Sequence, residues 1–319
     1  MPSTSRRAFI AAAATGALAG CSAFRGGTDR TTEFTLTLRS IDGELSEHVL
    51  WEPPERDSPF AAVRRDAWQA AVAGERYTNY GYPAVPDGEY TAHDGEYYQL
   101  HDVVTGSERI ERSVLRLTWV GDAEADGTPE ATPREALPPI DRNAVMPAYF
   151  AARAREHDGG APWDAVERGG FVYRHLDRIE SELAPTPAHD HVSVHDTVLA
   201  VDVSQETLVE PAHTAVATRV ATSERGFEQV ADAALVEARV SLSTLETEAR
   251  ELFGRVLTRE RHTESVPLSD AYGTLLTELG FRDSLDCAPD SCRDELVGRR
   301  YVAVDGDHYQ ASLSIDADA

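Results

Sequence analysis

The 319-residue sequence contains no lysine. All 30 basic residues are arginines, which excludes a lysine Schiff base and the lysine-dependent phosphate loop of many nucleotide hydrolases. Acidic residues number 55, so the formal charge is -25. Such a chain lacks the basic face that a phosphate backbone requires, and we expect no nucleic-acid partner. The excess of carboxylates repels itself at low salt and is screened at molar salt, where the Debye length is about 3 Å.

The sequence also lacks the short motifs that mark common active sites. It contains no G-x-S-x-G, H-E-x-x-H, G-x-G-x-x-G or phosphate-loop pattern. Pairs of carboxylates carry no information, because acidic residues occur so often along this chain. We therefore predict no cofactor and favour a non-enzymatic protein. A hydrolase site assembled from distant residues stays open as the alternative, since catalytic triads are defined by geometry.

No apolar run is long enough for a permanent membrane span. The uncharged segment 8–18 holds about 11 residues, against the roughly 20 that a spanning helix needs. Arg6 and Arg7 precede it within Ser-Arg-Arg-Ala-Phe-Ile, and Leu-Ala-Gly-Cys ends it at Cys21. These parts predict a twin-arginine export signal over residues 1–20 and a lipidated Cys21. The small, polar segment 21–32 is then a flexible tether.

Together with the acidic, lysine-free composition, these features resemble the uncharacterised lipoproteins of haloarchaea that carry a twin-arginine signal and a lipobox. The resemblance implies an exported domain on the outer face of the cell membrane, attached through the lipid on Cys21. A protein of the cell envelope is then a possible partner. The resemblance covers little of the chain and implies no activity and no catalytic residues.

Cysteine is scarce, with three residues in the whole chain. Cys287 and Cys292 enclose four residues, and outside the cytoplasm this spacing favours a disulfide that closes a small loop. Free thiols and a metal site stay open as alternatives. Thiol labelling with and without a reductant distinguishes the bridge from free thiols.

Two segments are alike and predict β-hairpins. Residues 90–100 and 301–311 each place Asp-Gly between alternating residues, a strong signal for a two-residue turn. Residues 192–202 form a third, weaker copy without the glycine. The similarity suggests an internal duplication.

Helices are expected at 59–74, 142–156, 162–180, 244–261 and 267–280, and strands at 34–38, 114–120, 214–220 and 234–242. The predicted fold is α+β, with about three units in series after the signal peptide. Each unit combines helices with an antiparallel hairpin or meander. The expected boundaries are 33–120, a linker at 121–137, then 138–222 and 223–319.

Two groups of side chains are candidate sites. His189 and His191 lie close together on an expected strand and are candidate metal ligands, but no third ligand is evident, so we predict no metal site. Tyrosines crowd the region 77–98 near Trp68, and we interpret them as core and hairpin residues rather than a binding surface. We expect a binding or envelope module, with a hydrolase or a solute-binding lipoprotein as alternatives.

Overall fold

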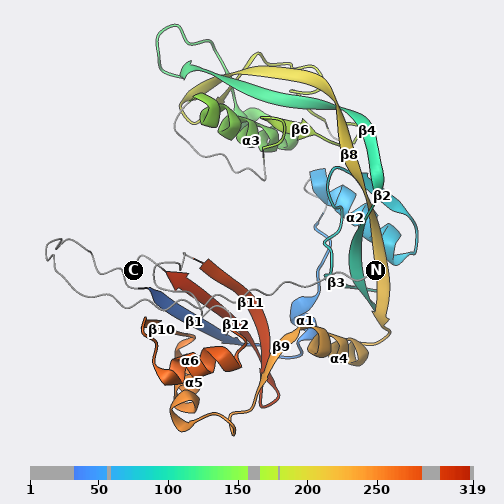
Figure 1. Ribbon diagram of the computed structural model, residues 1–319. Helices are drawn as coiled ribbons and strands as arrows, with labels where there is room; N and C mark the ends of the chain where they lie inside the picture. Colours follow the sequence, from blue (N-terminus) through green and yellow to red (C-terminus); the bar gives the residue numbers. More distant parts are fainter. Residues whose placement is uncertain (1–31, 56–58, 157–165, 179, 282–294, 317–319) are drawn as a thin grey trace, which may run out of the picture. The chain divides into compact units, whose positions relative to one another are not determined.

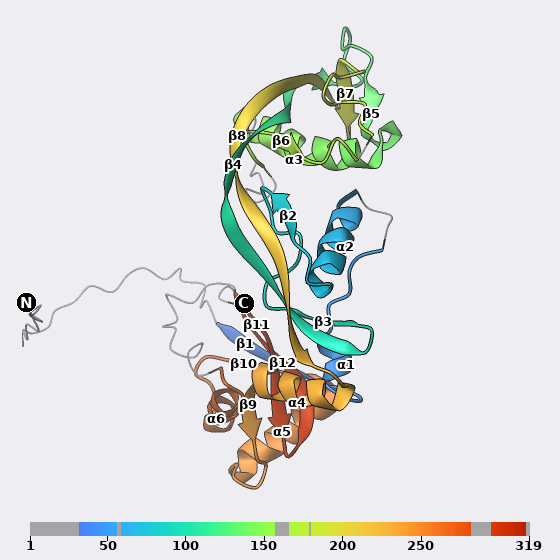
Figure 2. The same ribbon diagram turned by 90° about the vertical axis from the view of Figure 1, so that its right-hand side faces the viewer.

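The computed structural model describes residues 32–55, 59–156, 166–178, 180–281 and 295–316. They divide into two compact units, shown in Figure 1 and Figure 2. Unit 1 combines the described residues up to Ser40 with those from Glu237 onward, and unit 2 consists of the described residues in the continuous segment Ile41–Val236. No helix among the described residues is long and apolar enough to cross a membrane.

Unit 1 is a five-stranded sheet with two helices. The strand order is β10-β1-β12-β11-β9. The strands are β1 (Glu33–Ser40), β9 (Val236–Val240), β10 (Arg261–Ser265), β11 (Glu295–Val304) and β12 (Asp307–Asp316), and the helices are α5 (Thr247–Arg259) and α6 (Asp270–Glu278). β1 is antiparallel to both neighbours, β10 and β12.

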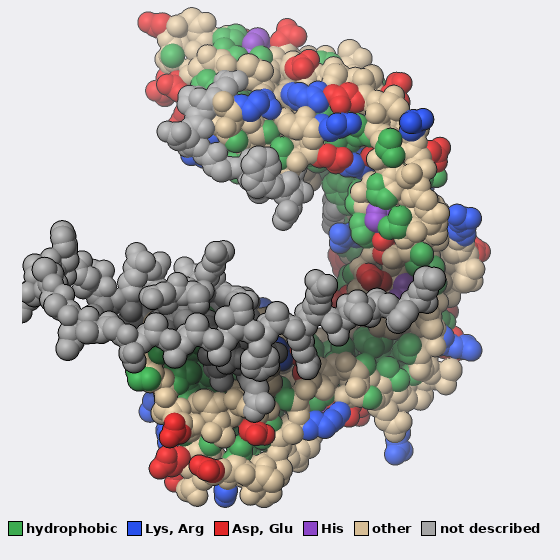
Figure 3. Space-filling view, in the orientation of Figure 1, with side chains coloured by type: hydrophobic (Ala, Val, Ile, Leu, Met, Phe, Trp, Pro, Cys, Tyr) green, Lys and Arg blue, Asp and Glu red, His purple; other side chains and the backbone are tan. Residues whose placement is uncertain are grey.

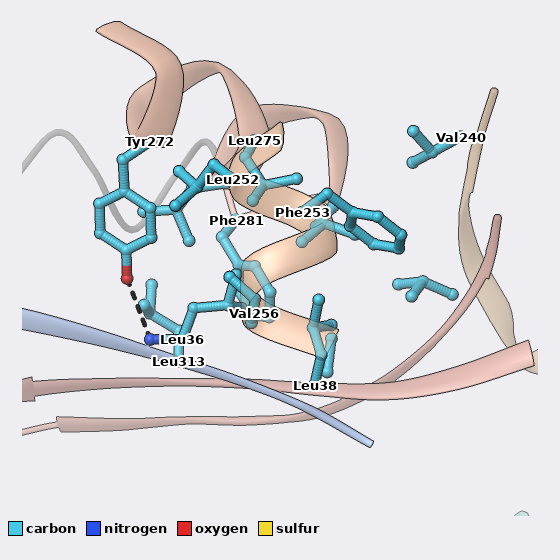
Figure 4. Packing of buried hydrophobic residues seen from close by; sticks show 14 of the residues in the cluster. Leu36, Leu38, Val240, Leu252, Phe253, Val256, Tyr272, Leu275, Phe281 and Leu313 are labelled. Carbon is cyan, nitrogen blue, oxygen red and sulfur yellow. Dashed lines mark hydrogen bonds between the residues drawn. The ribbon is translucent and has the colours of Figure 1, made fainter. Parts of the chain in front are cut away.

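The core of unit 1 lies between this sheet and the two helices (Figure 4). On β1, Phe34, Leu36 and Leu38 are buried and alternate with half-exposed threonines, which confirms the alternation expected from the sequence. Phe253 and Leu275 from the two helices belong to the same apolar cluster. Burial of apolar surface between the sheet and the two helices is the main source of stability available to a unit of this size.

Tyr272 of α6 joins this core to the backbone of the sheet. Its buried hydroxyl donates to the carbonyl oxygen of Phe34 and accepts from the amide of Leu36, at 3.0 Å in both cases. Figure 4 shows the contact with Leu36. Burial raises the pKa of Tyr272, so the hydroxyl stays protonated and keeps its donor role.

Replacement of Tyr272 by phenylalanine leaves two buried backbone groups of β1 without this partner. We expect a loss of about 1–3 kcal/mol in the stability of unit 1. Hydrogen exchange of peptides from β1 measures it, and the β1 amides should exchange faster. Tyr301→Phe on β11 is the matched control, and equal exchange rates in the two variants would contradict the assignment.

Unit 2 is organised around two very long antiparallel strands, β4 (Glu96–Asp122, 27 residues) and β8 (Thr197–Ala221, 25 residues). They pair from Tyr97 opposite Ala221 to Asp122 opposite Thr197 and form a continuous ribbon. Shorter strands flank it: β2 (Tyr77–Tyr80), β3 (Tyr90–His93), β5 (Thr132–Pro133), β6 (Phe171–Tyr173) and β7 (His191–Val194). The helices are α1 (Ser46–Val49), α2 (Pro59–Val72), α3 (Pro139–Glu156) and α4 (Glu224–Leu235), with a 3-10 turn at Arg134–Ala136.

The two ends of the ribbon have separate cores. Helix α2 packs Val63 and Ala67 against Leu100 of β4 and Ala215 of β8. Helix α3 packs on the other end, in a cluster that contains Leu115 and Leu117 of β4 together with Leu199 of β8. Because one pair of strands serves both cores, neither end is an independent domain.

The expected series of about three α+β units is wrong. The chain is a mixed α/β protein, mostly strand, with two sheets. A helix, a short strand and a hairpin do recur in this order along the chain. Each short strand, however, pairs with a strand that does not belong to the hairpin that follows it. β2 pairs with β8, β6 pairs with β4, and β10 pairs with β1. Because these short strands pair with distant strands, the segments cannot fold as separate units in series. Sequence similarity alone does not reveal this pairing.

The three hairpins were predicted correctly. Their two-residue turns lie at 94–95, 195–196 and 305–306, between β3 and β4, β7 and β8, and β11 and β12. Asp94, His195 and Asp305 each have a φ near +50°. Glycine follows in the first and third turns, where φ is again positive.

Four of the five predicted helices are confirmed as α2, α3, α5 and α6. The helix expected at 162–180 is wrong, because Phe171–Tyr173 is the strand β6. The segments 114–120 and 214–220 are strands, but they continue β4 and β8 rather than adding a third strand to a meander. Segment 234–242 begins as the end of α4 and continues as β9.

Candidate functional site

A pocket of about 410 Å³ lies in unit 2, where the start of α2 meets β6 and the loop after β2. Its lining combines aromatic and aliphatic side chains with two arginines: Pro54, Phe60, Ala61, Arg64, Tyr82, Phe171, Val172 and Arg174. The volume falls within the range of small-molecule sites. The pocket depends on pairing between distant strands. β2 pairs with β8 and β6 pairs with β4, and these pairings bring Tyr82 and Arg174 to the same place.

Arg174 forms one wall and is held by two carboxylates. Its Nε donates to Oε1 of Glu210 at 2.8 Å, and its Nη2 donates to Glu167. Gly81 makes room for this guanidinium, since a Cβ there would lie 2.4 Å from Nε of Arg174. Gly81 also has a φ of +92°, which favours glycine. The guanidinium lies 5.9 Å from the centre of the Tyr82 ring, within cation–π range.

Glu210 is the anchor of the site. Its side chain is 2% exposed, and Oε2 accepts from Nε and Nη2 of Arg112 at 3.1 and 2.7 Å. The carboxylate therefore bridges Arg112 on β4 and Arg174 after β6, with an arginine on each oxygen. On the face of unit 2 drawn in Figure 3, acidic and basic side chains lie next to one another over the α3 and β6 region.

Oη of Tyr82 and Nε2 of His175 are buried beside the pocket, and the side chain of Asn79 lies next to the Tyr82 hydroxyl. The two rings make an edge contact, with centroids 6.0 Å apart. Burial raises the pKa of Tyr82 to about 12, so its hydroxyl is protonated near neutral pH. Burial, followed by the charge of Arg112, lowers the pKa of His175 and favours its neutral form.

Arg64 is the second cation of the pocket. It lies on α2, is exposed, and makes no hydrogen bond or ion pair with any residue that the structure describes. The first turn of α2 contains no acidic residue. Arg64 therefore differs from Arg174, whose charge is balanced by carboxylates.

A second arrangement in unit 2 matches part of a catalytic site. Nδ1 of His213 on β8 lies 2.6 Å from Oδ2 of Asp102 on β4, and the two side chains are 10% and 8% exposed. An aspartate placed in this way orients the imidazole in catalytic triads. No hydroxyl or thiol of a described residue hydrogen-bonds to His213. Within the described chain the pair therefore lacks a nucleophile.

His189 and His191 do not form a metal site with other described residues. Nδ1 of His189 contacts the Thr132 hydroxyl at 3.0 Å, and Nε2 contacts the carboxylate of Glu182 at 2.8 Å. Both ring nitrogens are therefore occupied. His191 is half-buried on β7, and no cluster of three ligating side chains occurs among the described residues.

The crowded tyrosines are distributed over several roles. Tyr77 packs in the α2 core, Tyr90 is buried, and Tyr97 stacks on Phe227 with centroids 4.6 Å apart. Trp68 packs on the same core and donates to the Thr91 hydroxyl. These positions agree with the core and hairpin interpretation. Tyr82 differs, because it lines the pocket.

Several predicted sites lie outside the described residues, namely Arg6, Arg7, Cys21, Cys287 and Cys292. The pocket itself was missed by the sequence interpretation. Phe171 and Arg174 fell inside the wrongly predicted helix at 162–180. The aromatic and β-branched segment Phe-Val-Tyr after two glycines is the signal that could have indicated a short strand there.

Comparison with protein-family models, with curated proteins and with solved structures gives no match. The site is therefore interpreted from its own geometry.

Proposed function

We propose that this chain is an exported, lipid-anchored binding protein that holds a small molecule in the unit 2 pocket without converting it. The observation that carries the binding role is the pocket itself, about 410 Å³ with aromatic walls and a fixed arginine wall. Ala61 and Val172 in its lining are almost fully buried, at 1% and 4% exposure. Concave apolar surface with a few placed polar groups is the usual form of a ligand site.

A hydrolase is the second candidate, and the contact between Asp102 and His213 is the observation that favours it. The pair combines residues 111 positions apart, as a site assembled from distant residues would. We favour binding because no described hydroxyl or thiol contacts the imidazole, whereas the pocket is already lined by groups that suit a ligand.

The binding role predicts that the full-length protein takes up Nile red, a neutral apolar dye, at molar KCl. We expect saturable binding with an enhanced dye fluorescence. Ala61→Leu fills the pocket from its buried side and should weaken binding at least about tenfold, a cost of about 1.4 kcal/mol.

Ala62→Leu is the matched control, because Ala62 is the exposed neighbour on the same helix. Circular dichroism of both variants shows whether they are folded. Equal dye binding by two folded variants would reject the pocket as the binding site.

Export and anchoring are supported by the N-terminal sequence. Arg6 and Arg7 suit a twin-arginine address, and Cys21 suits lipidation. The lipid would hold the protein on the outer face of the membrane, with the tether between anchor and unit 1. A disulfide between Cys287 and Cys292 belongs to the same proposal, since it requires an oxidising compartment.

Cys21→Ser is expected to move the protein from the membrane fraction to the soluble fraction of a halophilic host, because the acyl attachment point is lost. Immunoblotting of the separated fractions measures the change. Cys287→Ser is the control and should stay with the membrane. Retention of Cys21→Ser in the membrane fraction at the wild-type level would disprove the lipid anchor.

A further inference from the structure

We propose that the pocket selects a small organic monoanion, with an aromatic or branched apolar body and one carboxylate or similar acidic group. This inference rests on the proposed binding function and names its ligand class. Two features of the pocket lead to it, its walls and its charge.

The walls specify the body of the ligand. Phe60 from α2 and Phe171 from β6 supply aromatic faces, and Val172 and Ala61 supply aliphatic surface. Each of the two aromatic residues also packs against the α3 core, so their positions are fixed before any ligand arrives. A volume of about 410 Å³ lies near the lower end of the range for ligand pockets, which favours a small molecule over a long chain.

The positive charge of the pocket indicates that the ligand carries an acidic group. The lining and the side chains bonded to it, directly or through Glu210, contain four arginines, Arg64, Arg65, Arg112 and Arg174, and two glutamates, Glu167 and Glu210. Arg65 donates to the carbonyl oxygen of Pro54, so Arg64 is the lining arginine without a carboxylate among the described residues. A local positive charge is unusual in a chain of formal charge -25. A ligand carboxylate would gain a charge-assisted hydrogen bond from Arg64.

Isothermal titration calorimetry of the full-length protein at molar KCl tests the ligand class with three probes. These are naphthylacetate, its neutral amide naphthylacetamide, and acetate. We expect naphthylacetate to bind at least about tenfold more tightly than the amide, because only the acid pairs with Arg64. Acetate alone should show no measurable heat, because it lacks the apolar body.

One variant isolates the contribution of the charge. Arg64→Gln should reduce the affinity for naphthylacetate to that for the amide and leave the affinity for the amide unchanged. Arg255→Gln is the matched control, since Arg255 is an exposed helical arginine of unit 1.

The outcomes distinguish the ligand class from the binding function. Equal affinity for acid and amide, or an Arg64→Gln variant that binds the acid like wild type, would overturn the monoanion proposal. The same holds if Nile red enters the pocket and naphthylacetate does not. If neither Nile red nor any of the three probes binds, the proposed binding function fails as well.

Discussion

Replacement of Glu210 by alanine is expected to destabilise unit 2 by about 3–5 kcal/mol, because it removes one partner of a buried ion group. Glu210 is 2% exposed and lies between Arg112 and Arg174, which are 16% and 11% exposed. Without it, Arg112 loses its carboxylate and Arg174 keeps only Glu167. Two largely buried guanidinium groups would then face each other without the intervening negative charge.

Urea unfolding at molar KCl measures this change. All four tryptophans of the sequence lie between residues 51 and 163, so tryptophan fluorescence follows unit 2 alone. Glu111→Ala is the control, because Glu111 is an exposed glutamate on the same ribbon. A Glu210→Ala midpoint equal to that of the control would show that the ion group contributes little.

The same variant should also impair ligand uptake. Arg174 forms a wall of the pocket, and Glu210 holds its Nε in place. We expect Nile red binding to weaken in Glu210→Ala under conditions in which the variant is still folded. Unchanged binding would mean that Glu167 alone positions Arg174.

Replacement of Asp141 by alanine is expected to cost about 2–6 kcal/mol, since one buried donor and two part-buried donors lose their acceptor. Asp141 is fully buried in the first turn of α3. Its carboxylate accepts from the hydroxyls of Tyr173 and Ser181 at 2.7 and 2.6 Å, and from the amide of Glu182 at 2.7 Å. Burial and the negative charge of Asp141 raise the pKa of Tyr173, which keeps its hydroxyl a donor.

Asp141 thus connects α3 and β6 to the loop that leads towards β7. Its loss should loosen that loop as well as lower the unfolding midpoint, and tryptophan fluorescence in urea again reports the midpoint. Asp126→Ala, an exposed aspartate of unit 2, is the control. Asp141→Asn retains an acceptor and should cost less than alanine. Equal midpoints for all three variants would remove Asp141 from the set of stabilising residues.

Local features of the fold could be predicted from the sequence. Alternating Phe34, Leu36 and Leu38 indicated a half-buried strand, and Asp-Gly pairs fixed two hairpins, because both signals depend on neighbouring residues. Proline at the start of a helix indicated α2 in the same way. The pairing of β2 with β8 and of β6 with β4 depends on contacts between distant segments, and a single sequence carries no local signal for it.

The candidate site was hidden for the same reason. Its lining joins residues from Pro54 to Arg174 through the pairing between distant strands. Arg64 and Arg174 are two of many arginines in the sequence, and only the structure shows that one is balanced by Glu210 while the other has no carboxylate among the described residues. His189 and His191, the weak metal candidates of the sequence, have ordinary polar or half-buried surroundings.

The place of β1 in unit 1 determines when that unit can be completed during synthesis. β1 lies between β10 and β12, and Thr35 bonds to Thr263, 228 positions later in the chain. Unit 2 is continuous and can fold as soon as it has been made, whereas β1 keeps its apolar side chains uncovered until the last strand is translated. Contacts of such long range are slow to form. If export follows the proposed twin-arginine route, which carries folded proteins, closure of the sheet around β1 is the step that makes a newly made chain ready to leave the cell.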